Sequence, residues 1–237
     1  MQLFYQPDIE ESSSEIIFDK EESRHINKVL RKREGDLLQI TNGNGYFFKA
    51  EIILSENKKC TAKILEVTRE KSMPYRLHLA VAPTKLNDRY EWFLEKATEI
   101  GISEITPIIC DHSERKVIKP ERYEKIIQSA MKQSLKANLP KLNAAIPYKQ
   151  FIKEQAKTTD SKYIAHCEEG NKASLKESAA KGENLLILIG PEGDFSREEI
   201  QFAIEHNFKP VSLGNSRLRT ETAAIVAAHS IAFVNED

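Results

Sequence analysis

The stretch that most constrains this chain lies near its C-terminal end, at residues 185–228. It holds two successive units, and each has the pattern of a strand, a glycine turn and a helix. Residues 185–189 are wholly apolar, which predicts a strand buried on both faces that ends at Gly190. Residues 211–213 predict a second short strand, ended by Gly214. Open α/β sheets bind ligands at the carboxyl ends of their strands, so the two turns mark a candidate site.

The helices that follow these turns have recognisable start signals. Ser196 and Glu199 have the spacing of a capping box, and Phe195 and Ile200 have that of a hydrophobic staple. In the second unit, Thr220 is the expected cap of a final helix that is apolar almost all round. Such a helix is expected in a core or at a dimer interface.

The composition is that of a globular chain with one large domain or two ordinary ones, since it has 237 residues of which 40% are hydrophobic. No apolar run approaches membrane-spanning length, and residues 8–22 do not resemble a signal peptide, so we expect a cytoplasmic location and no membrane contact. Cys60, Cys110 and Cys167 are widely spaced. We therefore expect buried reduced thiols, and neither a disulfide nor a metal site.

The pattern of predicted elements changes near residue 70. Before it, short apolar runs alternate with turns, and residues 42–45, Asn-Gly-Asn-Gly, predict a hairpin in a small antiparallel barrel or sheet. Residues 25–33 predict a short helix there. Beyond residue 74, strand and helix patterns alternate, which is typical of a parallel sheet covered by helices. The expected domains are therefore 1–70 and 74–237, in an α/β chain with an N-terminal barrel.

Charge is uneven although the net charge is only −1. Two stretches are rich in cations: Arg24, Lys28, Arg31, Lys32 and Arg33 in the first, and Lys132, Lys136 and Lys141 in the second. Either one alone is best interpreted as a solvated face. Together they leave RNA binding open.

The first glycine turn, residues 190–194, is neither a P-loop nor a GxGxxG motif. Glu192 and Asp194 place negative charge where a phosphate would bind. Because the helix dipole stabilises carboxylates at this position, one interpretation is a well-capped turn without a ligand. The other is a site for a guest that tolerates acids, such as an adenosine bearing a sulfonium and an ammonium group.

The second turn brings Arg217 and Arg219 close to the start of the final helix. Cations are unfavourable there, so these arginines need an anionic partner. That partner is either a substrate phosphate or carboxylate, or Glu221 of the chain itself.

Several segments, in order along nearly the whole chain, resemble one known family. They are HINKVLR at 25–31, KLNDRYEWFLEKATEIG at 85–101, QSAMKQSLKANLP at 128–140, IGPEGDFS at 189–196 and LGNSRLRTETAA at 213–224. The chain resembles the RsmE-type 16S ribosomal RNA (uracil-N3)-methyltransferases of the SPOUT superfamily. Two departures from the family pattern are Asp194, where a third glycine is usual, and Ser216-Arg217, where Arg-Ile is usual.

The resemblance implies an N-terminal PUA-like β-barrel, a C-terminal α/β domain with a trefoil knot, S-adenosylmethionine as cofactor, a homodimer, and 16S ribosomal RNA or the 30S subunit as partner. It implies that three loops, 166–170, 189–193 and 213–218, hold the cofactor. The cofactor residues carried over are Cys167, Glu168, Ile189, Gly190, Gly193, Leu213, Gly214, Arg217 and Leu218.

In that reading Arg219 stabilises charge on the uracil oxygens or anchors a phosphate, and Glu192 is a candidate base. The residues expected to hold the RNA backbone are Arg24, Arg31, Lys85, Lys132 and Lys136. Two alternatives stay open: a SPOUT enzyme that methylates transfer RNA ribose, and a non-catalytic module for RNA binding or ribosome assembly.

Overall fold

A computed structural model describes residues 2–56, 59–158, 160–170 and 172–236. The chain divides into two compact units, Met1–Ser72 with Met131–Leu139, and Met73–Ala130 with Pro140–Asp237. The sequence patterns assign the segment 131–139 to the C-terminal domain. It belongs instead to the N-terminal unit, because Leu139 N–H donates to Gly43 O and Gly45 N–H donates to Ala137 O, both at 2.8 Å.

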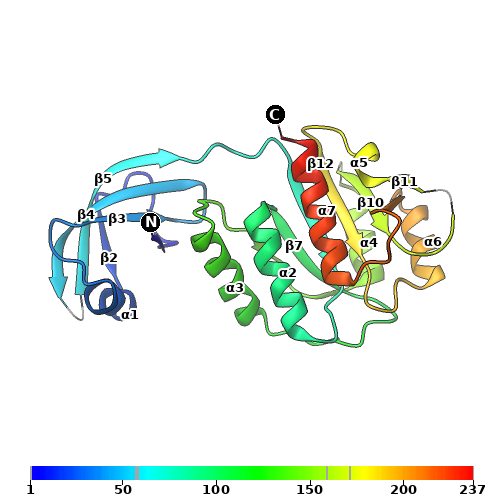
Figure 1. The fold of residues 1–237 in the computed structure, drawn as a ribbon, viewed down its shortest axis with the longest axis horizontal. Helices are drawn as coiled ribbons and strands as arrows, with labels where there is room; N and C mark the ends of the chain where they lie inside the picture. The colour runs from blue at the N-terminus through cyan, green and yellow to red at the C-terminus, as the bar shows by residue number, and fades with distance from the viewer. Residues whose placement is uncertain (1, 57–58, 159, 171, 237) are drawn as a thin grey trace. The chain divides into compact units, whose positions relative to one another are not determined.

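The N-terminal unit is built on a curled five-stranded sheet (Figure 1). Its strands, in sheet order, are β1 (Leu3–Tyr5), β3 (Leu37–Thr41), β4 (Tyr46–Glu56), β5 (Lys59–Arg69) and β2 (Glu15–Phe18). β1 runs parallel to β3, and the other pairs are antiparallel. The predicted hairpin at residues 42–45 is confirmed, because it joins β3 to β4. The buried core of the N-terminal unit includes Phe4, Phe18, Ile26 and Phe48.

The helix of this unit differs from the prediction of 25–33. It begins earlier as α1 (Lys20–Arg24), capped by Asp19, and continues as a π-helical turn, His25–Val29. It also ends earlier, and Arg31 has a left-handed backbone with φ of 56°.

The C-terminal unit holds a larger parallel sheet. Its strands, in sheet order, are β11 (Ala173–Ser174), β13 (Lys209–Ser212), β10 (Ser161–Ala165), β12 (Asn184–Ile189), β6 (Arg76–Val81), β7 (Glu104–Ile109) and β8 (Lys141–Leu142), with β9 (Ile146–Pro147) paired to β7. The predicted strand at 185–189 is confirmed, and all five of its side chains are buried at 2% exposure or less.

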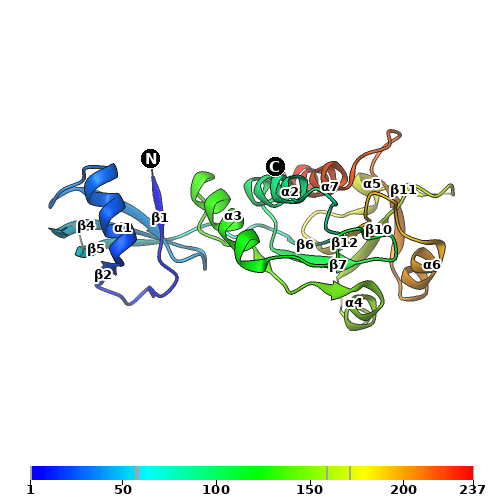
Figure 2. The same ribbon diagram turned by 90° about the horizontal axis from the view of Figure 1, so that it is seen from below.

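Helices cover both faces of this sheet (Figure 2). α2 (Asn87–Ile100), α5 (Leu175–Ser178) and α7 (Thr220–Val234) pack together on one face, whereas α4 (Tyr148–Gln155) and α6 (Arg197–Glu205) lie on the other. The remaining helix is α3 (Pro120–Gln133), whose last turn begins the segment 131–139 of the N-terminal unit. Within the described residues, no helix is both long and apolar enough to cross a membrane.

The strand order has one feature that local sequence patterns do not reveal. In the sheet, β13 lies between β10 and β11. β11 belongs to the segment that connects β10 to β12, so β13 lies within the loop that this segment forms. The chain enters β13 from α6 on one face and leaves it to α7 on the other. The C-terminal segment is therefore threaded through that loop, whereas general connection rules predict an unthreaded sheet. This threading is the arrangement expected of the knot that the resemblance implies.

Candidate active site

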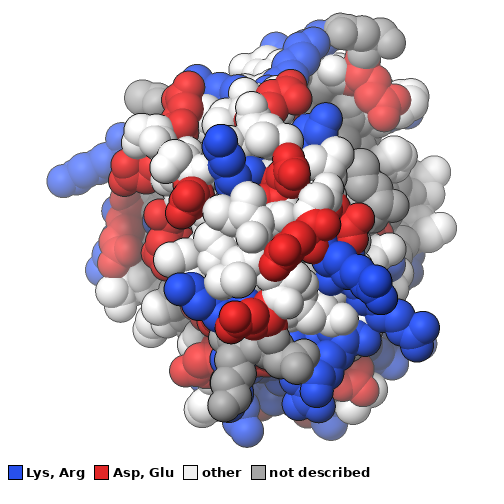
Figure 3. Space-filling view, turned by 90° about the vertical axis from the view of Figure 1, so that its left-hand side faces the viewer, with Lys and Arg blue, Asp and Glu red and all other residues white. Residues whose placement is uncertain are grey.

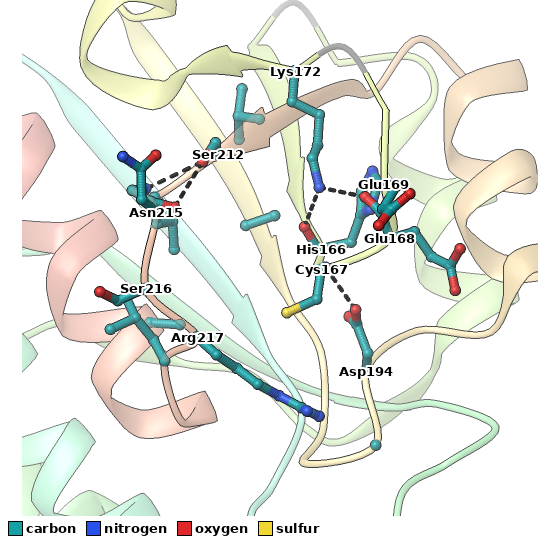
Figure 4. Close-up of a pocket in the computed structure, with 17 residues that line it drawn as sticks. His166, Cys167, Glu168, Glu169, Lys172, Asp194, Ser212, Asn215, Ser216 and Arg217 are labelled. Carbon is teal, nitrogen blue, oxygen red and sulfur yellow. Dashed lines mark hydrogen bonds between the residues drawn. The ribbon is translucent and has the colours of Figure 1, made fainter.

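Loops after β10, β12 and β13 enclose two adjoining cavities at the carboxyl edge of the sheet. The larger measures about 650 Å³ and the smaller about 270 Å³. Residues shared by their walls are Ala165, Cys167, Asp194, Arg217, Leu218 and Ala223. Figure 4 shows the larger cavity, into which Arg217 points from the third loop and across which Cys167 and Asp194 lie. The two glycine turns are thus neighbours in space.

The structure brings together every residue assigned from the sequence to the cofactor or to catalysis. The larger cavity is lined by Cys167, Glu168, Gly193, Leu213, Gly214, Arg217 and Leu218. The smaller is lined by Ile189, Gly190, Glu192 and Arg219 in addition to three of these. Of the residues assigned to RNA, only Lys85 belongs to the same unit; Arg24, Arg31, Lys132 and Lys136 belong to the N-terminal unit.

The loop after β12 is fixed by its own hydrogen bonds. Gly190 leaves little room for a side chain, because a Cβ there would lie 3.1 Å from the Phe195 ring. The predicted capping box is confirmed. The Ser196 side chain accepts from the backbone N–H of Glu199, and the Glu199 side chain accepts from the backbone N–H of Ser196. Between Gly190 and Ser196, Asp194 has a φ of 62° and its N–H donates to Pro191 O at 2.9 Å.

The Asp194 carboxylate ties this loop to the loop after β10. Its Oδ2 accepts from Cys167 N–H at 2.7 Å, and its Oδ1 accepts from Phe195 N–H at 2.9 Å. The expectation of three buried thiols holds for Cys60 and Cys110 but is wrong for Cys167, which is exposed at the wall of both cavities.

A lysine that the sequence patterns did not single out shapes the loop after β10. Lys172 Nζ donates to His166 O at 2.7 Å and to Glu168 O at 2.6 Å, as Figure 4 shows. Neither ring nitrogen of His166 has a partner among the described residues, and both are buried. Burial, together with the nearby Lys172 ammonium, lowers the pKa of His166, so its ring is neutral near pH 7.

The start of α7 differs from the prediction. Thr220 is the first helical residue rather than the cap, and the cap position is held by Arg219 without a side-chain bond. Thr220 Oγ1 instead donates to Gly190 O at 3.0 Å. A side chain committed to the neighbouring loop is unavailable to cap its own helix.

Glu221 is not the anionic partner of the two arginines. It is buried and pairs with Arg89 at 3.7 Å. Arg217 and Arg219 are both exposed and form no ion pair with any described residue. Their positive charge at a helix start is therefore available to an anionic ligand.

The chemistry of the larger cavity fits S-adenosylmethionine. Glu168, Glu169 and Asp194 offer carboxylates to a sulfonium and an ammonium group, and Arg217 offers a guanidinium to a carboxylate. A volume of about 650 Å³ is in the range of small-molecule sites. The described residues contain no group of three or more His, Cys, Asp or Glu able to hold a metal ion.

Glu192 is held in place at the smaller cavity. Its Oε1 accepts from Lys85 N–H at 2.8 Å, while the Lys85 ammonium pairs with Glu114 at 2.7 Å. Arg115 donates to the carbonyls of Thr84 and Lys85 at 3.0 and 2.8 Å. The carboxylate therefore lies on a braced loop.

The fold and the site define an RNA methyltransferase. Residues 71–232 match the family of the RNA methyltransferase domain, and residues 18–65 match the RNA methyltransferase PUA domain. The α/β domain with a parallel sheet and the PUA-like N-terminal domain that the sequence predicts are confirmed.

Relatives narrow the class to one family. The chain is 33% identical to the ribosomal RNA small subunit methyltransferase E of Buchnera aphidicola over 90% of this chain and 86% of that protein. The Bacillus subtilis protein of the same name is 29% identical over 91% and 89%. The chain belongs to the ribosomal RNA small subunit methyltransferase E family.

Solved structures agree with this assignment. A probable rRNA-methyltransferase from Porphyromonas gingivalis matches with a TM-score of 0.90 and 43% identity, covering 99% of this chain and 98% of that one. A putative methyltransferase from Legionella pneumophila, in complex with the cofactor SAM, matches with a TM-score of 0.86 and 30% identity over the same shares.

Proposed function

We propose that this chain transfers the methyl group of S-adenosylmethionine to N3 of a specific uridine in the 16S ribosomal RNA of the small subunit. The observation that carries the proposal is the pair of adjoining cavities. One has acids and an arginine suited to the cofactor, and the other holds Glu192 and Arg219 beside it. Family membership and the SAM-bound relative from Legionella support the same reaction.

In this reaction the cofactor supplies an electrophilic methyl group, and the chain supplies positioning. The loops after β10, β12 and β13 hold the cofactor in the larger cavity. Uracil N3 lies on the pairing edge and carries a proton, so the base must be unpaired and the proton must be removed. Glu192, at the smaller cavity, is the proposed base. Arg219 is proposed to stabilise the charge that develops on the uracil oxygens.

The proposed contacts with the RNA backbone lie largely on the N-terminal unit. Arg24 and Arg31 are exposed there, and Lys132 and Lys136 are half-buried in its segment 131–139. Figure 3 shows Lys and Arg side chains gathered toward the lower right of the view, with Lys, Arg, Asp and Glu side chains mixed over the rest. We propose that such a patch holds phosphates, so RNA binding should weaken as salt rises.

We also propose that the chain forms a homodimer through the face of α2 and α7. Phe233 on α7 is 65% exposed and Trp92 on α2 is 44% exposed, although the two helices pack together. Large apolar side chains exposed on one face are typical of an interface. A Phe233→Glu variant should sediment as a monomer if the dimer uses this face. The expected cytoplasmic location stays a prediction.

Two measurements test the reaction. Ribosomal RNA from a deletion strain should lack N3-methyluridine while its transfer RNA nucleosides are unchanged; the reverse result would favour the transfer RNA ribose alternative. Calorimetry should give heat with S-adenosylmethionine, and its absence would favour a non-catalytic RNA-binding or assembly module.

A further inference from the structure

A histidine outside both cavities contacts the loop that forms their shared wall. His112 Nδ1 lies 3.1 Å from the carbonyl oxygen of Gly193 and 3.0 Å from that of Asp194. Carbonyl oxygens only accept, so Nδ1 carries the proton and donates to both. Glycine at 193 favours this close approach, because a Cβ there would lie 3.1 Å from His112 Cβ and one of the two would have to shift by a few tenths of an ångström.

The two carbonyls bracket Asp194. The Gly193 carbonyl precedes its φ bond and the Asp194 carbonyl follows its ψ bond, so one donor bonded to both oxygens restricts the two dihedral angles together. Asp194 needs such a constraint, because its φ of 62° is in the left-handed region that residues other than glycine rarely adopt.

The fixed backbone aims the Asp194 carboxylate. From this conformation it accepts from Cys167 N–H at 2.7 Å, and this bond joins the loop after β12 to the loop after β10. Both loops line the larger cavity. The position of the loop after β10 therefore depends in part on the backbone dihedral angles of Asp194, in addition to the two bonds from Lys172.

His112 itself is presented by a rigid segment. Residues 110–113 form a turn closed by hydrogen bonds between its ends. Asp111 N–H donates to Glu199 at 2.9 Å, and the Asp111 carboxylate accepts from Ser196 Oγ at 2.7 Å. The turn is thus bonded to the start of α6, and the imidazole can act as a fixed brace.

We propose that His112 is a positioning residue for cofactor binding: its imidazole fixes the left-handed backbone of Asp194, whose carboxylate then holds the loop of Cys167. It touches neither cavity, so it acts only through the loop. This inference rests on the proposed cofactor site.

Three variants test the brace. His112→Ala removes the donor, His112→Asn keeps an N–H near the place of Nδ1, and Lys116→Ala removes an exposed cation of the same segment as a control. By calorimetry, S-adenosylmethionine should bind His112→Ala about 3- to 10-fold more weakly, the range expected for one lost hydrogen bond. It should bind the other two as it binds the wild type. The KM for the cofactor should rise with little change in kcat.

Amide hydrogen exchange in the cofactor-free protein gives a readout that does not depend on activity. The Cys167 amide should lose protection in His112→Ala and keep it in His112→Asn. Unchanged protection of that amide in His112→Ala would overturn the proposal. A wild-type protein that does not bind S-adenosylmethionine would contradict the proposed function and leave this test of the brace intact.

A second experiment repeats the His112→Ala substitution in an Asp194→Gly background. Glycine adopts the left-handed backbone without help but has no carboxylate to hold Cys167. In that background His112→Ala should change cofactor affinity by less than about twofold, because the residue through which it acts is gone. Equal weakening in both backgrounds would show that His112 does not act through Asp194.

Discussion

The hydroxyl of Thr220 donates a hydrogen bond of 3.0 Å to the carbonyl oxygen of Gly190, and this bond joins the two glycine turns. Thr220 is 5% exposed and Gly190 is also buried. Both residues line the smaller cavity, so the bond fixes the distance between two of its walls.

Thr220→Val should remove this bond while keeping the shape of the side chain. A buried carbonyl left without a donor costs about 1–3 kcal/mol, so the free energy of unfolding should fall by that amount. Cofactor affinity should fall as well, because the loops separate. Thr220→Ser, which keeps the hydroxyl, is the control. Urea unfolding and calorimetry measure both effects, and a Val variant as stable as the wild type would contradict them.

Arg219→Ala tests the charge proposed to act on the uracil. Arg219 is exposed and has no ion-pair partner among the described residues, so its loss should leave the fold intact. We expect kcat to fall about 100-fold or more, as for removal of one group that stabilises an oxyanion, with cofactor affinity retained. Lys153→Ala, which removes an exposed cation from α4, is the control. Methylation at the normal rate would rule out the role given to Arg219.

Glu192→Gln separates proton removal from loop geometry. A glutamine oxygen can still accept from Lys85 N–H, so the loop should keep its position. It cannot take up a proton, and the rate of single-turnover methylation should fall about 100-fold or more if Glu192 is the base. Retention of most of the rate would move the search for the base to another group. The melting temperature of the variant should match that of the wild type.

Local patterns predicted local structure well. The apolar run 185–189 gave a buried strand and the Ser196–Glu199 spacing gave an observed capping box, because both depend on neighbours in the sequence. The family resemblance added the three loops, and the structure places all of the carried-over cofactor residues at two adjoining cavities.

What the sequence did not predict depends on contacts between distant segments. The local sequence is consistent with Thr220 as a helix cap. In the structure its hydroxyl instead donates to the carbonyl oxygen of Gly190, thirty positions earlier. Cys167 is exposed because the cavity opens beside it. His112 follows a different strand from the loop that it contacts, and no spacing rule relates them.

The buried His78 should make stability depend on pH. It is 2% exposed, its Nε2 lies 2.7 Å from Thr106 Oγ1, and burial lowers its pKa to about 4 from an ordinary value of 6.5. The unfolded chain then binds the proton more readily. The contribution of neutral His78 to the free energy of unfolding is fully present above pH 6.5 and is lost as the pH falls toward 4. The loss amounts to about 2 kcal/mol at pH 5.

Urea unfolding near pH 7.5 and pH 5 measures this loss. His78→Gln cannot take up a proton, so the pH dependence of its unfolding free energy should be smaller than that of the wild type by about 2 kcal/mol over this interval. His229→Gln, at an exposed position on α7, should behave as the wild type. Equal pH dependence in wild type and His78→Gln would show that another group titrates.

Arg31→Gly separates RNA binding from folding more cleanly than an alanine would. Arg31 is exposed and has a left-handed backbone, with φ of 56°, which glycine adopts without strain. The free energy of unfolding should therefore stay the same or rise by up to about 1 kcal/mol. If the guanidinium contacts a phosphate, RNA affinity should fall, and the slope of log K against log salt should become smaller by about 0.7–0.9.

The control is Lys63→Gly, which removes an exposed cation from β5. It would lower stability and leave the slope unchanged. An unchanged slope in Arg31→Gly would remove this residue from the RNA surface, because a stable variant leaves no folding defect to explain it.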